Sequence, residues 1–180
     1  MINRNFTPFP ILTTKRLTLR QLAITDGQDI FALRSDAEIN KYLNRQACTT
    51  VEDAIGFINK IDGSVKKNDS VYWAITLTNT EAFVGTICLF NFSNEKNKCE
   101  IGYELLTNFQ GQGIMREATE KVIDFAFHTI RVQKIEAFTH NGNENSTKLL
   151  EKLNFIKSLE ADEEYPVLNI FTLTNSIENP

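Results

Sequence analysis

Cysteine is scarce in this sequence, and its spacing matches neither a disulfide framework nor a metal site. The 180 residues contain three cysteines, Cys48, Cys88 and Cys99. An odd number of cysteines without a Cys-x-x-Cys pair argues against structural disulfides and against zinc. We therefore expect a protein without a bound metal that works in a reducing, cytoplasmic environment.

Long apolar runs and basic runs are also missing. Residues 1–14 contain no continuous apolar core of a signal peptide, and no later stretch approaches the roughly 20 apolar residues of a membrane span. The net charge is −4 and the basic residues are scattered, so the sequence lacks the positive footprint of a nucleic-acid-binding protein. These absences predict a soluble protein that is not exported and that binds neither membranes nor nucleic acids.

The composition that remains is typical of a globular domain. Hydrophobic residues make up 42% of the chain and charged residues 23%, enough to bury a core without disulfides or metal. No repeat, linker or low-complexity tract divides the sequence. We expect a single domain over residues 1–180.

Strand-like and helix-like apolar patterns follow one another along the chain. Alternating or short apolar runs predict strands at residues 16–22, 71–77, 83–92, 99–106, 133–139 and 164–173. Helical spacing predicts helices from residue 25 to about 35, near 39–43, from 49 or 50 to 66, at 114–128 and at 144–153. The resulting order predicts an α/β (α+β) fold, with a mixed sheet and helices on both faces.

The most informative stretch connects the strand that ends at Leu106 to the helix that begins at Ile114. It reads Gln110-Gly111-Gln112-Gly113-Ile114-Met115. Two glycines let the backbone turn without a Cβ clash, so that successive N–H groups and the positive end of the helix dipole can attract a phosphate. Arg116 stands where a dinucleotide fingerprint needs glycine or alanine, and no Gly-Lys-Ser/Thr of a P-loop follows. A plain connecting turn remains the alternative.

Four segments together resemble the GNAT superfamily of acetyl-CoA-dependent N-acetyltransferases, and in particular its RimJ/RimL branch, which acts on ribosomal-protein N-termini. The segments are Thr14–Arg20, Ile101–Leu105, Gln110–Ala118 and Asn143–Phe155. The resemblance covers roughly residues 14–173, which we take as the core of the domain. It implies a mostly antiparallel sheet of about six to seven strands, with acetyl-CoA as the co-substrate.

The resemblance also implies which residues bind acetyl-CoA. The backbone amides that would hold its pyrophosphate belong to Gln110, Gly111, Gln112, Gly113, Ile114 and Met115. A backbone N–H at Leu105 or Leu106 would polarise the thioester carbonyl, and Asn143 would contact the pantetheine arm or the neighbouring backbone. Asn108 departs from the arginine or glutamine that the family pattern has at this position. Binding through main-chain groups tolerates that change.

Direct attack by a neutral amine on the thioester requires a proton acceptor and a donor for the departing thiolate. Glu104, which shares a strand face with Glu100, is our first candidate base, and His140 or water is the alternative. The ordinary interpretation of Glu104 is a solvated carboxylate on a strand, and that of His140 is an exposed histidine. Many GNAT enzymes use a tyrosine as the acid, but Leu150 occupies its position. Ser146 is then the candidate acid, although it also suits the first turn of a helix that Asn143 caps.

The acceptor that the resemblance favours is the α-amine at a protein or peptide N-terminus. Such an amine has a reference pKa of about 7.7 to 8.0 against about 10.4 for lysine, so it loses its proton more easily. A small amine, such as an amino acid, polyamine or drug, is the alternative, and a non-catalytic acyl-CoA-binding module is a third. Substrate choice is expected to lie in residues 25–66 and near residues 162–166. The protein is expected to be a monomer or a homodimer.

Overall fold

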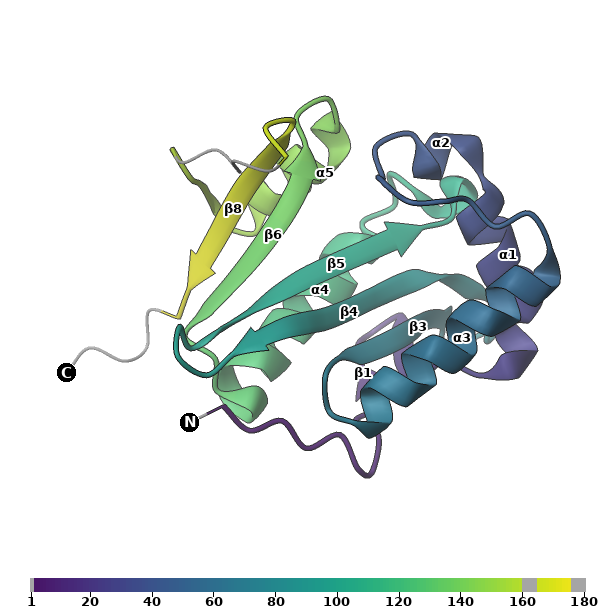
Figure 1. The fold of residues 1–180 in the computed structure, drawn as a ribbon, viewed down its shortest axis with the longest axis horizontal. Coiled ribbons are helices and arrows are strands. Elements are labelled where there is room, and N and C mark those ends of the chain that lie inside the picture. Colours follow the sequence, from purple (N-terminus) through teal and green to yellow (C-terminus); the bar gives the residue numbers. More distant parts are fainter. Residues whose placement is uncertain (1, 160–164, 176–180) are drawn as a thin grey trace.

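The computed structural model describes residues 2–159 and 165–175, and its centre is an eight-stranded sheet (Figure 1). The strands are β1 (Leu12–Thr13), β2 (Leu17–Gln21), β3 (Val71–Leu77), β4 (Phe83–Ser93), β5 (Lys98–Leu105), β6 (Lys134–His140), β7 (Ile156–Lys157) and β8 (Leu168–Thr174). Their spatial order is β1-β2-β3-β4-β5-β6-β8-β7. All neighbours are antiparallel except β5 and β6, which run parallel.

The predicted mixed, mostly antiparallel sheet is therefore confirmed. The structure adds two strands that the sequence pattern did not indicate, β1 and β7, because two residues are too few for an alternating pattern. The last strand was predicted from residue 164 and begins at Leu168. Residue 164 itself lies outside the described residues.

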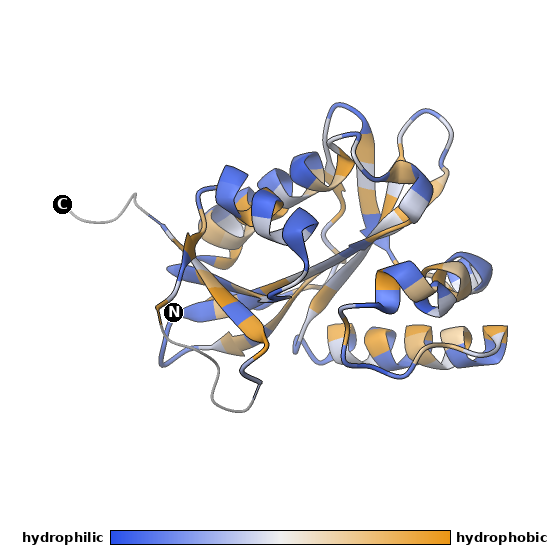
Figure 2. Cartoon of the chain, turned by 90° about the horizontal axis from the view of Figure 1, so that it is seen from above, coloured by the Kyte–Doolittle hydropathy of each residue, from blue (hydrophilic) through white to orange (hydrophobic). Residues whose placement is uncertain are grey.

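Helices cover both faces of the sheet, as predicted (Figures 1 and 2). They are α1 (Gly27–Ser35), α2 (Ala37–Asn40), α3 (Val51–Lys66), α4 (Ile114–Phe125) and α5 (Glu144–Lys152). Helices α1 to α3 lie on one face, and α4 and α5 lie on the other. In the part of the chain that is described, none of the helices has the length and apolar character needed to cross a membrane.

Helix boundaries follow local signals. At the start of α3, the Thr50 hydroxyl accepts from the Asp53 backbone N–H at 3.1 Å, and the Asp53 carboxylate accepts from the Thr50 N–H at 3.0 Å. This reciprocal pair is a capping box, and it begins the helix at one of the two expected residues. Helix α4 was expected to continue to His128, but its α-helical part ends at Phe125 and continues as a wider π-helical turn over Ala126–Ile130.

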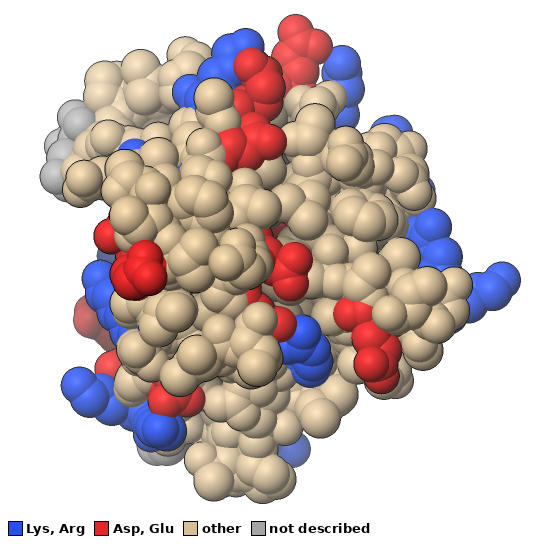
Figure 3. Space-filling model, turned by 90° about the vertical axis from the view of Figure 1, so that its right-hand side faces the viewer, with Lys and Arg blue, Asp and Glu red and all other residues tan. Residues whose placement is uncertain are grey.

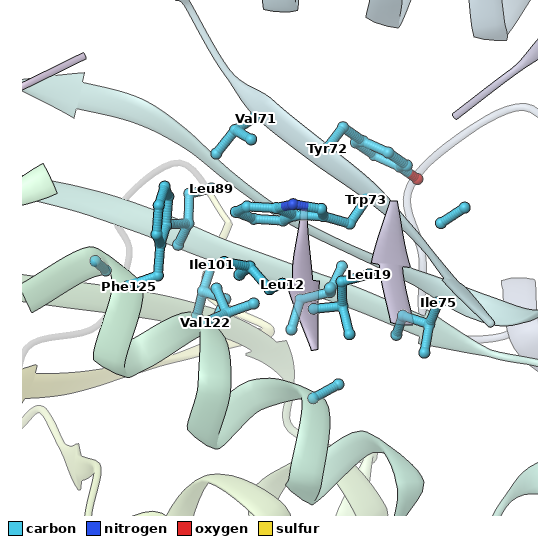
Figure 4. Packing of buried hydrophobic residues seen from close by; sticks show 14 of the residues in the cluster. Leu12, Leu19, Val71, Tyr72, Trp73, Ile75, Leu89, Ile101, Val122 and Phe125 are labelled. Carbon is cyan, nitrogen blue, oxygen red and sulfur yellow. The ribbon is translucent and has the colours of Figure 1, made fainter. Parts of the chain in front are cut away.

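Neighbouring residues of β3 fill the two layers of the core (Figure 4). Trp73 is fully buried on the α4 side, where its ring packs edge-on against Phe125 at a centroid distance of 5.6 Å. Tyr72 points to the α3 side and packs edge-on against Phe57. Its hydroxyl donates to Thr86 Oγ1 at 3.0 Å, and burial raises the pKa of Tyr72 well above its ordinary value. The α3 side of the sheet therefore carries polar groups as well as apolar ones.

Strands β5 and β6 pair only at their beginnings and then separate (Figure 1). The parallel register runs from Lys98↔Lys134 to Glu100↔Glu136. Glu136 holds this closed end together, since its carboxylate pairs with Lys98 and lies 2.8 Å from Lys134 Nζ. Beyond Glu100, the outer edge of β5 faces an opening.

Candidate functional site

A cavity of about 620 Å³ lies where β5 and β6 have separated. Its walls come from β3 to β6, from α1 and α3, from the loop after α2, from the start of α5 and from the chain around Tyr165–Leu168. Figure 3 shows the side of the molecule that carries α1 to α3, where charged side chains are sparse and of mixed sign. The cavity therefore extends from the opening between β5 and β6 to the helices that were expected to determine substrate specificity.

The glycine loop has the geometry of an anion site. Gly111 and Gly113 both have φ of +74°, a conformation that side chains with a Cβ rarely adopt. Gly113 precedes α4 without a side-chain cap. Within residues 2–159 and 165–175, no group accepts a hydrogen bond from the backbone N–H of Gly111, Gln112, Gly113 or Ile114. These donors at a helix N-terminus fit the pyrophosphate of acetyl-CoA.

The polar side chains of the loop donate hydrogen bonds to backbone carbonyls in the loop and just before it. Gln110 Nε2 donates to the Leu105 carbonyl at 3.1 Å, and Gln112 Nε2 donates to the Asn108 carbonyl at 3.0 Å. Arg16, from the turn before β2, donates to the Gln112 carbonyl at 3.1 Å. The side chains thus fix the backbone, and Asn108 takes part through its main chain.

A second contact, next to the glycine loop, joins two of the segments that resemble the GNAT superfamily, Thr14–Arg20 and Gln110–Ala118. The Glu117 carboxylate accepts from Arg16 Nε at 2.6 Å and from the Thr14 hydroxyl at 2.6 Å. Burial alone raises the pKa of Glu117, but the hydrogen bonds from Thr14 and Arg16 outweigh it, so that the net pKa lies below its ordinary range. The contact could not be predicted from the sequence, because about a hundred residues separate the partners and no local pattern connects them.

The backbone of β5 narrows the choice of donor for the thioester carbonyl. The Leu106 N–H donates to the Val84 carbonyl at 2.9 Å, so this group is already paired within the sheet. N–H groups alternate between the two edges of a strand. The Leu105 N–H therefore points away from β4, into the opening beside β6.

Glu104 faces the cavity as half of a buried ion pair. Its oxygens accept from Arg45 Nη1 at 2.5 Å and Nη2 at 2.7 Å, and Arg34 Nη1 lies 3.9 Å from the same carboxylate. The Glu104 side chain is 14% exposed. Sequence analysis missed both arginines, since they lie in the segment 25–66 and belong to no recognisable motif. The role of Glu104 as a base stays a prediction.

Ser146 and Asn143 lie at the start of α5, on the opposite side of the opening. The Asn143 side chain accepts from the Ser146 N–H at 3.2 Å, which makes Asn143 the helix cap. The Ser146 Oγ lies 2.8 Å from the Tyr103 hydroxyl, a partner that sequence analysis missed. Burial raises the pKa of Tyr103 to about 12, so its phenol stays protonated near neutral pH. The contact of Asn143 with pantetheine stays a prediction.

His140 and the cysteines also have definite environments. The His140 Nδ1 accepts from the Gly142 N–H at 3.0 Å, so the proton of the neutral ring belongs on Nε2. The ring therefore presents a donor, and its lone pair is already used. Burial raises the pKa of Cys88 and that of Cys99 to about 12, which keeps both thiols protonated.

The two segments expected to choose the substrate are described unequally. Residues 25–66 form α1 to α3 and contribute Arg34, Lys41 and Phe57 to the cavity wall. Tyr165 also lines the cavity, whereas residues 162–164 lie outside the described residues.

The comparisons with known proteins all find similarity to acetyltransferases. Residues 16–156 match the family model described as the acetyltransferase (GNAT) domain. YoaA of Bacillus subtilis (strain 168), described as an uncharacterized N-acetyltransferase, is 32% identical over 83% of this chain and 84% of its own length. The protein p20 of Bacillus licheniformis, described in the same words, is 35% identical over 81% of this chain and 82% of its own.

Solved structures share the fold at lower identity. A ribosomal-protein-S5-alanine acetyltransferase from Vibrio fischeri has a TM-score of 0.81 and 22% identity, with coverage of 95% of this chain and 100% of that chain. RimL, a ribosomal L7/L12 α-N-protein acetyltransferase solved with coenzyme A, has a TM-score of 0.80 and 16% identity, with coverage of 94% and 100%.

Proposed function

The chain belongs to the GNAT acetyltransferase family and is an acetyl-CoA-dependent N-acetyltransferase, and from this premise we propose that it acetylates the α-amine at a protein or peptide N-terminus. The observation that carries this choice is the charge of the cavity. Glu104 is the only carboxylate among the described lining residues, and Arg45 already pairs with it. The described part of the lining therefore does not supply the acidic surface that a polyamine or cationic drug needs.

Different residues around the opening have different roles in the reaction. Acetyl-CoA supplies the acetyl group as a thioester, so the amine nitrogen gains the acyl carbon and CoA leaves as the thiol. The N–H groups from Gly111 to Ile114 hold the pyrophosphate. The Leu105 N–H donates to the thioester carbonyl as negative charge develops on its oxygen. Ser146 donates the proton that the departing sulfur gains, and water replaces that proton on the hydroxyl.

Proton removal from the amine falls to Glu104. An ionised carboxylate has about four acceptor positions, and the two donors of Arg45 use two of them. An α-amine with a reference pKa of about 7.7 to 8.0 is partly neutral near pH 7, so acceptance through one water molecule is enough.

A panel of acceptors tests the proposal. Release of the CoA thiol is followed with N-terminal peptides, the same peptides blocked at the N-terminus, lysine side-chain analogues and polyamines, and mass spectrometry locates the acetyl group. We expect turnover with free α-amines only. Acetylation confined to polyamines or to side-chain amines would contradict the proposed acceptor.

Variants test the residue assignments in the same assay. Glu104→Gln and Ser146→Ala are each expected to lower kcat by about a hundredfold, the lower end of the range for acid and base groups. Lys60→Gln, on the exposed side of α3, is the control. Unchanged turnover in both variants would show that these assignments are wrong.

A further inference from the structure

Arg34 lines the cavity, and its guanidinium group forms no hydrogen bond with any residue that the structure describes. Its side chain is 15% exposed, and its Cζ lies 3.8 Å from the centre of the Phe57 ring. Across residues 2–159 and 165–175, no atom accepts a hydrogen bond from its buried Nε. Among the described residues, the nearest carboxylate oxygen belongs to Glu104 and is 3.9 Å from Nη1, which is too long for a hydrogen bond.

The charge of Arg34 is not needed to balance Glu104. Arg45 meets both oxygens of that carboxylate at 2.5 and 2.7 Å, in the two-donor geometry that satisfies a carboxylate best. Lys41 adds another positive charge to the described lining. The described lining therefore holds an excess of positive charge, and a buried cation that shares its carboxylate with a second arginine is costly unless a further anion binds to it.

We infer that Arg34 binds a carboxylate carried by the acceptor, so that the preferred substrate is an amine with an anionic group close to it. This inference rests on the part of the proposed function that makes an α-amine the acceptor. A guanidinium offers parallel donors that match a carboxylate, and stacking on Phe57 holds its plane in a fixed orientation. The carboxylate has two possible sources: the side chain of an N-terminal aspartate or glutamate in a peptide, or the α-carboxylate of a free amino acid.

Binding to the CoA-saturated protein tests the inference without turnover. Calorimetry compares a peptide that begins with aspartate to the same peptide beginning with asparagine, and alanine to alaninamide. We expect at least one acid to bind about tenfold more tightly than its amide, the effect of one charge-assisted contact. Preference in the peptide pair identifies the side-chain source, and preference in the alanine pair identifies the free amino acid. Equal affinities within both pairs would overturn the inference.

Variants separate recognition from a structural role. Arg34→Gln is expected to reduce the acid-to-amide affinity ratio to about one, while the affinity for the amide stays the same. Arg4→Gln removes a guanidinium that also lies near a phenylalanine ring, at 6.0 Å from the centre of Phe92 and outside the cavity, and should keep the ratio. If Arg34→Gln weakens acid and amide by the same factor, Arg34 is structural and the inference is wrong.

Two further measurements keep the result interpretable. Thermal unfolding checks that each variant folds; if Arg34→Gln does not, Arg34→Lys carries the test and should lower the ratio severalfold, because lysine lacks the two-donor fork. Acetylation products are identified in parallel. A preference for acids with acetylation of side-chain amines would contradict the proposed function alone, whereas α-amine acetylation without that preference would contradict the inference alone.

Discussion

The hydroxyl of Tyr103 lies 2.8 Å from the hydroxyl of Ser146 and links β5 to α5 across the strand opening. Burial raises the pKa of the phenol to about 12, so Tyr103 is protonated at working pH and can donate. When it does, Ser146 accepts on its oxygen and its own proton is available for another acceptor. Tyr103 therefore orients the group proposed to donate to the leaving sulfur, and it comes from a different element than the tyrosine that Leu150 replaces.

Tyr103→Phe removes only this hydroxyl. We expect kcat to fall about threefold to tenfold, the effect of one lost hydrogen bond, with little change in KM for acetyl-CoA. The measurement is a double-mutant cycle in steady-state kinetics: in a Ser146→Ala background, Tyr103→Phe should have almost no further effect. Independent, multiplying losses would show that Tyr103 does not act through Ser146.

Gly113→Asp tests the phosphate cradle. At φ of +74° any side chain strains the backbone, and a carboxylate would place negative charge among the N–H groups. We expect the Kd for acetyl-CoA to rise more than tenfold, measured by calorimetry. Gly56→Asp on α3 is the matched control, since a Cβ there has no neighbour within 4 Å, and it should leave the Kd unchanged. An unchanged Kd for Gly113→Asp would contradict the loop assignment.

Much of the fold was predictable from local patterns. The helical spacing of α4 follows directly from burial of one face, the mostly apolar run of β3 follows from burial of both faces, and the Thr50 cap is a four-residue signal. The loop at Gly113 was predictable for the same reason, because its chemistry lies in consecutive backbone groups. The two-residue strands and the π-helical end of α4 were not predictable from the sequence, since packing against distant segments determines whether they form.

The cavity walls were predictable only in part. Glu104 and Ser146 were found through their place on a strand and on a helix. Their partners Arg45 and Tyr103 were missed, because 59 and 43 residues separate them and no periodicity connects the pairs. Arg34 could not be identified from the sequence for the same reason. The inference that it binds a substrate carboxylate depends on residues that are its neighbours only in space.

Glu117 links stability to pH. Its pKa in the folded protein lies below the ordinary 4.5, so the ionised form favours folding. This stabilisation is complete above the ordinary pKa and is lost as the pH falls through the lowered value. Glu117→Gln should lower the free energy of unfolding by about 1 to 2 kcal/mol at pH 7, with a smaller difference from the parent in acid.

Urea unfolding at pH 7 and at several acidic pH values measures this effect. Glu120→Gln is the control, because that exposed residue forms a surface pair with Arg116 and should cost at most about 0.5 kcal/mol. A difference between Glu117→Gln and the parent that stays constant into acid would show that ionisation of Glu117 does not stabilise the fold.

Gly85 sets the approach of β4 to the end of β5. A Cβ at this position would lie 2.2 Å from the Glu104 carbonyl oxygen and 3.0 Å from the Leu105 Cα, so Gly85→Ala must push the strands apart. We expect a loss of about 1 to 3 kcal/mol in unfolding free energy. Because the shift moves the Leu105 N–H but not the glycine loop, kcat should fall while the Kd for acetyl-CoA changes little.

Gly63→Ala is the matched control, since its Cβ meets nothing within 4 Å in α3 and alanine favours a helix. This variant should be as stable as the parent or slightly more so, with unchanged kcat. A Gly85→Ala protein that loses stability but retains full kcat would remove Leu105 as the donor to the thioester carbonyl, because a backbone N–H that tolerates this displacement does not depend on close alignment.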